Sequence, residues 1–165
     1  MNIEEAVVQW QQIYDLSLPM IVADDSEIWA VGGYPVDDEG RPYWRALCDL
    51  RTICMGGGRQ NGKNSWIARF MAENPKAILV EVNSSLRDYF VDAWKGPGDV
   101  FTRVFTIMDI VTISARNIEG KVDLLKDATH VIFNDASHNN AINSMQLAKA
   151  CNGLFTKSVV IVKMG

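Results

Sequence analysis

The apolar positions in the first fifty residues change from helical spacing to short, interrupted stretches. Residues 3–16 carry apolar side chains at helical spacing and predict an amphipathic helix that ends before Pro19. Residues 20–23 and 28–31 are short apolar runs on either side of a polar turn, and they predict extended segments. A polar loop rich in breaker residues at 32–42 separates this region from the rest of the chain.

From residue 51 onward, apolar runs typical of strands alternate with runs at helical spacing. This alternation predicts an α/β fold, a three-layer sandwich with a mainly parallel sheet, in which ligands bind at the carboxyl ends of the strands. We expect residues 1–50 to pack as a helix and loop region on a core formed by residues 51–165. The predicted strands are 53–55, 76–82, 100–113 (with a turn or a second extended piece at its end), 129–133 and 158–162, and the predicted helices are 66–71, 86–93, 119–125 and 141–154.

Composition narrows the class of protein. The 165 residues carry a net charge of −4, with acids and bases mixed along the chain, so there is no basic footprint for tight nucleic-acid binding. No apolar run is long enough to span a membrane, and residues 1–5 lack the basic start of a signal peptide. Cys48, Cys54 and Cys151 have no metal-site spacing and predict reduced, buried thiols. We therefore expect a soluble, cytoplasmic protein.

A glycine-rich segment follows the strand predicted at residues 53–55. From Gly57 onward it has the spacing G-x-x-x-x-G-K of a phosphate-binding loop. Glycines let successive backbone N–H groups turn toward a phosphate, the helix that begins near Lys63 adds its positive end, and Lys63 adds a full charge. A plain glycine-rich turn is the alternative interpretation. The predicted phosphate-binding residues are Gly57, Gly58, Arg59, Gln60, Asn61, Gly62, Lys63, Asn64 and Ser65.

On this segment the chain resembles the P-loop NTPases of the RecA-like, additional-strand type, and G-G-R-Q-N-G-K is similar to loops of large terminase subunits of tailed phages. The resemblance implies ATP and Mg²⁺ as ligands, with Lys63 near the outer phosphates. Asn64 stands where the family has the Ser or Thr hydroxyl that binds Mg²⁺, so Asn64 is the predicted metal ligand in its place. Arg59 either helps to neutralise the γ-phosphate or faces solvent.

A second motif is the apolar run at 131–133 followed by Asn134 and Asp135. It resembles the Walker B segment of helicases and terminases, in which an Asp holds the metal and a Glu orients the attacking water. Asn134 stands in the place of the Asp and Asp135 in the place of the Glu, and a shift of one residue makes Asp135 the acid associated with the metal. We predict Asn134 and Asp135 as catalytic residues with Lys63. Asp109, after 105–108, is the alternative metal ligand.

The aromatic and histidine side chains near these motifs allow two interpretations each. Tyr43 or Trp44 either stacks on adenine or, as we favour, packs in the core. His138 is either a switch that senses the phosphate or an exposed residue in a polar run. His130, at the start of a predicted strand, is expected to be structural.

Nucleotide binding is the function that these motifs predict first. Because three positions that handle Mg²⁺ or water are altered, we expect a slow or assembly-dependent ATPase, linked through the terminase resemblance to viral or phage nucleic-acid processing in the host cytoplasm. Its partners would be a nucleotide, DNA or a protein, and further copies of the chain in a homo-oligomer. The alternatives are a small-molecule or nucleotide kinase, and a non-catalytic interaction module with a P-loop fold.

Overall fold

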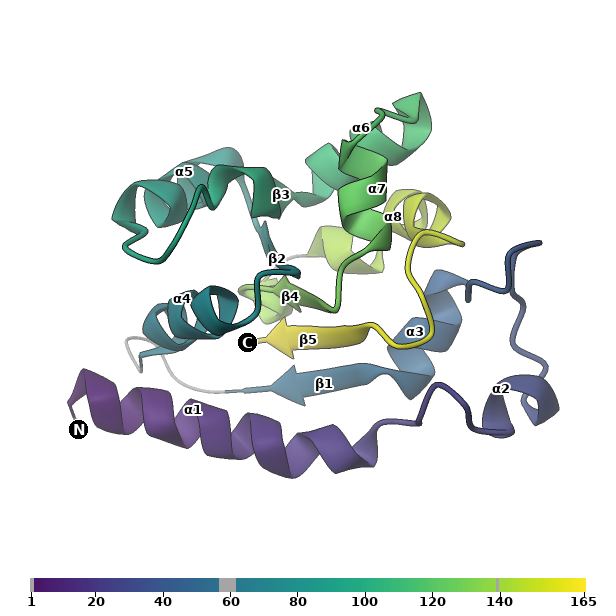
Figure 1. Ribbon diagram of the computed structural model, residues 1–165, viewed down its shortest axis with the longest axis horizontal. Coiled ribbons are helices and arrows are strands. Elements are labelled where there is room, and N and C mark those ends of the chain that lie inside the picture. Colours follow the sequence, from purple (N-terminus) through teal and green to yellow (C-terminus); the bar gives the residue numbers. More distant parts are fainter. Residues whose placement is uncertain (1, 57–61, 139) are drawn as a thin grey trace.

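The computed structural model describes residues 2–56, 62–138 and 140–165 (Figure 1). These residues form one sheet of five parallel strands in the order β1-β5-β4-β2-β3. The predicted α/β class with a parallel sheet is confirmed, and the helices on both faces are consistent with a three-layer sandwich. The strands are β1 (Thr52–Met55), β2 (Ala77–Glu81), β3 (Val104–Thr106), β4 (His130–Phe133) and β5 (Val160–Met164).

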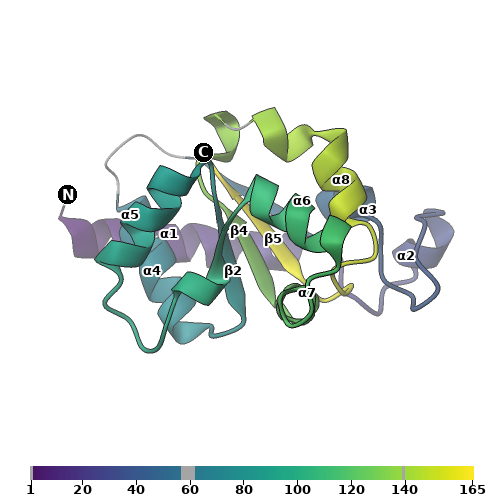
Figure 2. The same ribbon diagram turned by 90° about the horizontal axis from the view of Figure 1, so that it is seen from above.

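The helices cover both faces of the sheet, as the view from above shows (Figure 2). Helices α1, α4 and α5 lie on one side, and α3, α6 and α8 lie on the other. The α-helices are α1 (Ile3–Ser17), α2 (Ile28–Val31), α3 (Trp44–Leu50), α4 (Lys63–Glu73), α5 (Ser84–Ala93), α6 (Ile107–Arg116), α7 (Lys121–Lys126) and α8 (Met145–Cys151), and the 3₁₀ turns are η1 (Leu18–Met20), η2 (Phe101–Arg103), η3 (Ala136–His138) and η4 (Asn140–Asn143).

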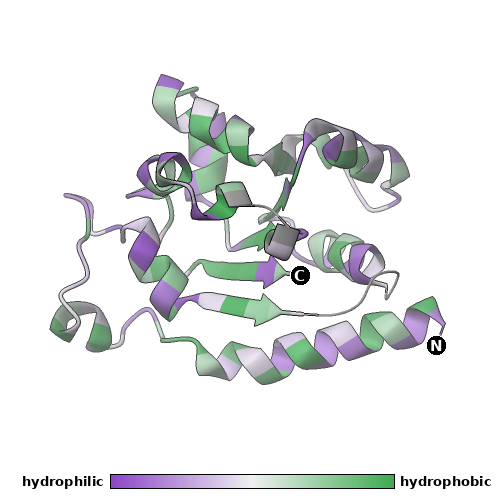
Figure 3. Ribbon diagram, turned by 180° about the vertical axis from the view of Figure 1, so that it is seen from behind, coloured by the Kyte–Doolittle hydropathy of each residue, from purple (hydrophilic) through white to green (hydrophobic). Residues whose placement is uncertain are grey.

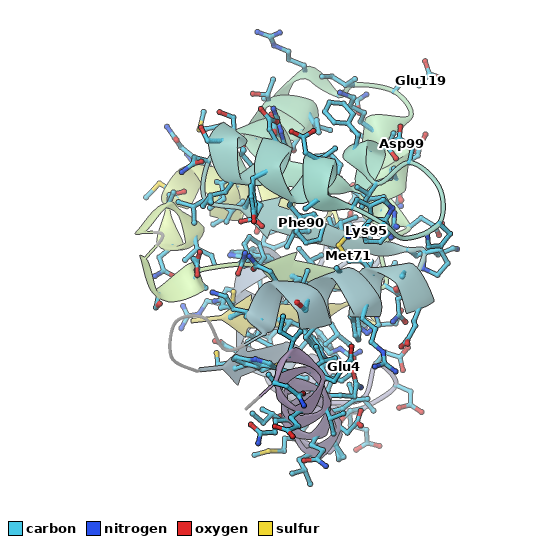
Figure 4. All side chains as sticks on the ribbon, turned by 90° about the vertical axis from the view of Figure 1, so that its left-hand side faces the viewer. Glu4, Met71, Phe90, Lys95, Asp99 and Glu119 are labelled. Carbon is cyan, nitrogen blue, oxygen red and sulfur yellow. The ribbon has the colours of Figure 1, made fainter. Side chains whose placement is uncertain are left out.

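Two apolar clusters, one on each face, hold the layers together. In the central strand β4, Val131 and Phe133 enter the cluster of α3, α6, α7 and α8, whereas Ile132 enters the cluster of α1, α4 and α5. This alternation follows from the two-residue period of a strand, and because helices cover both faces, the strand that ends at C is mostly apolar in Figure 3 apart from its purple tip. Figure 4 labels Met71 of α4 and Phe90 of α5, which pack together in the second cluster.

Helix α1 packs against α4. Its Asn2 side chain accepts a hydrogen bond from the N–H of Glu5 and completes a capping box. At the start of α4, Gly62 has φ +74°, and a Cβ there would lie 2.7 Å from the Cβ of Ala6 in α1. Glycine is therefore required at position 62 both by the backbone conformation and by the close approach of α1.

Three predictions about local structure are wrong. The strand predicted at 100–113 ends at Thr106, because the Thr106 side chain accepts from the N–H of Asp109 and caps helix α6. The segment 28–31 is helix α2 rather than extended, and of the segment 20–23 Met20 ends the 3₁₀ turn η1, whereas Ile21 has extended backbone as predicted. The helix predicted at 141–154 is shorter, because Ser144 caps α8 by accepting from the N–H of Leu147.

The cysteines only partly match the expectation of buried thiols. Cys151 is buried and Cys48 is half-buried, but Cys54 is exposed, since it alternates with the buried Ile53 and Met55 and lies on the opposite face of edge strand β1. Across the described residues, none of the helices has the length and apolar character needed to cross a membrane.

Candidate functional site

Charged and amide side chains meet where β2 and β4 end and α4 begins. In a parallel sheet the carboxyl ends of the strands lie at one edge, and the arrowheads of β1 and β5 point to the edge where α4 starts (Figure 1). We call this group the carboxyl-end cluster. It consists of Lys63, Asn64, Glu81, Asn134 and Asp135.

Lys63 and Asp135 form an ion pair between Nζ and Oδ1. Lys63 is the first residue of α4, and Asp135 lies two positions after the last residue of β4, so 72 positions of sequence separate the partners. Their side chains are 17% and 34% exposed. The structure therefore brings together the two residues that the sequence predicted as the phosphate-binding cation and the neighbouring acid.

Asn134 is the centre of the hydrogen-bond network. Its side chain is 4% exposed, and its amide nitrogen donates to Oε1 and Oε2 of Glu81 at 3.0 and 3.2 Å and to Oδ1 of Asn64 at 3.3 Å. Its own Oδ1 accepts from the backbone N–H of Asp135 at 3.0 Å. Asn134 thus links the last residue of β2 to the first turn of α4.

Glu81 is the member of the cluster that sequence reasoning missed. It is the last residue of β2 and is 2% exposed. Burial raises the pKa of the Glu81 carboxyl, the Asp135 carboxylate raises it further, and the Asn134 amide and Lys63 ammonium oppose the rise. The signal was available, since Glu81 is the one charge in the apolar run 77–82.

Asp135 has an unusual backbone conformation. Its φ is +49°, a left-handed value that is uncommon outside glycine, although Asp and Asn adopt it more readily than other residues. The left-handed residue turns the chain sharply between β4 and η3. This turn directs the Asp135 side chain toward Lys63, while Asn134 stays buried beneath it.

Asp109, the alternative metal ligand, caps the start of helix α6. It is the third residue of α6, where its carboxylate accepts from the N–H of Thr106 at 2.7 Å and from Nη1 of Arg87 at 3.2 Å. These are the capping-box bond and an ion pair. Asp109 was predicted as a metal ligand because it was expected at the end of a strand. It lies in helix α6 instead.

The remaining predicted site residues divide between described and undescribed parts of the chain. Gly57, Gly58, Arg59, Gln60 and Asn61 lie outside the described residues. Ser65 lies in the first turn of α4 and lines a pocket of about 220 Å³ between α4 and α5. Of the aromatic candidates, Trp44 is buried against Phe133 and Phe155, which confirms its packing role, whereas Tyr43 is exposed and does not pack in the core.

The histidines also differ in their placement. His130 lies at the opposite, amino end of the sheet, where Nε2 is 2.9 Å from the Tyr14 hydroxyl, so its predicted structural role agrees with its contacts. His138 belongs to η3, which follows Asp135. Among the described side chains, no group of three or more His, Cys, Asp or Glu residues forms a metal site. In the carboxyl-end cluster with Lys63, side-chain oxygen atoms come from Asp135, Asn64, Glu81 and Asn134.

A pocket of about 300 Å³ begins one residue beyond Asp135. Its lining comes from the carboxyl ends of β1 and β5 and from the segment after β4, so the pocket opens at the same edge of the sheet as the carboxyl-end cluster. The lining residues are Cys54, Met55, Gly56, Ala136, Ser137, Ile142, Asn143, Lys163 and Gly165.

No protein-family model, curated protein or solved structure matches the chain.

Proposed function

We propose that the protein binds a nucleoside triphosphate, ATP with Mg²⁺, and that it is a slow or assembly-dependent ATPase. The observation that carries the proposal is the position of Lys63. It lies at the first residue of a helix that follows a parallel strand and a glycine-rich segment, and it faces polar side chains at the end of a second strand.

The start of helix α4 and the charge of Lys63 both suit a phosphate group. The first N–H groups of the eleven-residue helix α4 have no partners within the helix and point toward the carboxyl edge of the sheet. The helix macrodipole adds positive potential at the same place. Lys63 adds a full charge, and the glycines predicted to surround the phosphate precede it directly in the sequence.

The sheet order also supports the additional-strand type of P-loop fold. Strand β5 lies between β1, which precedes the glycine-rich segment, and β4, which ends at Asn134 and Asp135. Strand β5 thus separates, within the sheet, the strands that precede the two motifs. Glu81 on β2 neighbours β4 on its other side.

The residues present fit a magnesium ion only weakly. Asn64 and Asp135 would supply an amide and a carboxylate oxygen, and the ion itself would neutralise charge on the phosphate oxygens. Glu81 would accept a hydrogen bond from the attacking water and orient it, because it is a buried carboxylate next to Asn134. Asn134 brings no charge where a carboxylate would hold the metal more strongly, so we infer slow turnover.

The wider setting of this activity rests on the resemblance alone. A link to phage nucleic-acid processing, a DNA or protein partner, and a homo-oligomer all follow from the terminase-like loop and stay predictions. A non-catalytic nucleotide-binding module is the second candidate. It is favoured by Asn134, which fills the position of the metal-holding acid with a neutral amide.

Thermal unfolding of the wild type and Lys63→Ala tests the proposal. ATP and Mg²⁺ at a hundredfold excess over Kd should stabilise the wild type by about 2.7 kcal/mol and leave Lys63→Ala unchanged. Lys149→Ala is a matched control, because it removes a lysine from α8. An unchanged wild-type transition in saturating ATP would contradict nucleotide binding. Phosphate release by the isolated chain then separates an ATPase from a binding module.

A further inference from the structure

The ion pair between Lys63 and Asp135 joins the two residues that a bound triphosphate would need separately. Lys63 is the cation that a phosphate would contact, and Asp135 is the carboxylate that a metal ion would contact. Both side chains are largely shielded from water, at 17% and 34% exposure, so the pair is less screened than an ion pair on the open surface.

Two features hold Asp135 in this place. Its backbone N–H donates to Oδ1 of Asn134 at 3.0 Å, and Asn134 is fixed in turn by Glu81 and Asn64. Its φ of +49° turns the side chain back toward α4. Asp135 is therefore positioned by a buried network that does not itself include Lys63.

We propose that Asp135 is a built-in competitor for the phosphate site, whose carboxylate occupies Lys63 until a phosphate displaces it. The inference rests on the proposed function and adds a regulatory step to the same site. A phosphate and the Asp135 carboxylate carry like charges, and both cannot share one ammonium group without repulsion. Binding must therefore open the pair, and the apparent affinity falls by the fraction of time that the pair is closed.

Magnesium reverses the effect of Asp135. Once a phosphate has taken Lys63, the released carboxylate is free to bind the cation that accompanies the triphosphate. The same side chain then opposes a metal-free polyphosphate and favours the magnesium complex. Asp135 thus selects for Mg²⁺-bound nucleotide at a site where Asn64 and Asn134 offer only neutral oxygen ligands.

The experiment compares the wild type and Asp135→Asn by isothermal titration with tripolyphosphate and with ATP, each in EDTA and in Mg²⁺. Asparagine tolerates the left-handed conformation at position 135, so the variant is expected to fold. If Lys63 is free about one-tenth of the time, Asp135→Asn should bind both ligands about tenfold more tightly in EDTA. In Mg²⁺ the gain should shrink or reverse.

Asp127→Asn is the matched control. It breaks another Lys–Asp pair, with Lys76 at 2.8 Å, at the amino end of the sheet, and should leave all affinities unchanged. Equal affinities of the wild type and Asp135→Asn in EDTA would overturn the competitor while the proposed function stands. If neither protein binds ATP or tripolyphosphate in any condition, the proposed function fails, and the competitor fails with it.

Discussion

At the amino end of the sheet Arg51 is held by backbone, whereas at the carboxyl end Glu81 and Lys63 are held by other side chains. Each guanidinium nitrogen of Arg51 donates to a carbonyl oxygen, of Val159 at 3.0 Å, Val22 at 2.6 Å and Ser158 at 2.7 Å. At the carboxyl end, Lys63 pairs with the Asp135 side chain, and Glu81 accepts from the Asn134 side chain as well as from the backbone of Val82.

The difference separates groups that support the fold from groups that are free to react. A carbonyl that belongs to the folded backbone cannot leave its donor without unfolding, so Arg51 is a fixed anchor. Side chains can rotate away and exchange partners with a ligand, and such polar clusters at strand ends are where α/β proteins bind ligands. Arg103 repeats the amino-end pattern, because its Nη1 donates to three carbonyl oxygens at 3.1 to 3.3 Å.

The largest effect on stability is expected from Arg51→Met. The substitution keeps an apolar stem but leaves three carbonyl oxygens without their donor, which should cost about 3–5 kcal/mol in the free energy of unfolding. Urea denaturation measures the loss. Arg45→Met is the matched control, since the Arg45 side chain is 89% exposed and pairs only loosely with Asp49, and it should change stability by about 0.5 kcal/mol or less.

A smaller loss in the free energy of unfolding is expected at low pH, through His130 at the amino end of the sheet. Burial and then the nearby Arg51 charge lower the pKa of His130 to about 4, so the imidazole is neutral in the folded protein. Because the folded pKa lies below the ordinary 6.5, the stability from neutral His130 is full above pH 6.5 and is lost as the pH falls toward 4.

The pH dependence of unfolding checks this. Between pH 6.5 and 4 the wild type should lose roughly 1–2 kcal/mol more than His130→Gln, which keeps a hydrogen-bonding side chain next to Tyr14. Parallel losses in the two proteins would show that His130 does not carry the acid sensitivity of the amino end.

The smallest effect is expected at the carboxyl end, and it has the opposite sign. Burial raises the pKa of Glu81, so the folded state is penalised as the pH rises above the ordinary range of a glutamate and through the raised value. Glu81→Gln removes that charge while its amide oxygen still accepts from Asn134. The variant should be roughly 1 kcal/mol more stable than the wild type at neutral pH, and the gain should vanish toward pH 4.

Urea titrations at several pH values measure the Glu81→Gln gain. A destabilised variant at neutral pH would mean that the Glu81 carboxylate is a structural anchor like Arg51, and the contrast between the two ends would not hold. If Glu81→Gln is more stable but loses ATP turnover, the Glu81 carboxylate is needed for activity and lowers the stability of the fold.

The sequence predicted the elements whose patterns are local. Helix α1 and strands β2 and β4 follow from apolar spacing within each segment. The end of β3 could not be read from hydropathy, because residues 107–113 are apolar in either conformation. The capping box of Thr106 and Asp109 was the decisive signal.

The candidate site was predicted only in part. Lys63, Asn134 and Asp135 were identified from motif spacing, and the structure brings them together. Glu81 was missed because no motif contains it, and its proximity to Asn134 depends on β2 lying next to β4. Strand order is a long-range property, so a pattern in one segment cannot reveal which strand ends meet.

The most direct test of the account is to map where ATP binds. Titration of ¹⁵N-labelled protein with ATP and Mg²⁺, followed by amide and side-chain NMR, reports both ends of the sheet at once. Nucleotide binding at the carboxyl-end cluster should shift the signals of Lys63, Asn64, Asp135 and the Asn134 side-chain amide and leave those of Arg51 and His130 unchanged. Absence of shifts at the carboxyl-end cluster, or shifts centred on Arg51 and His130, would contradict it.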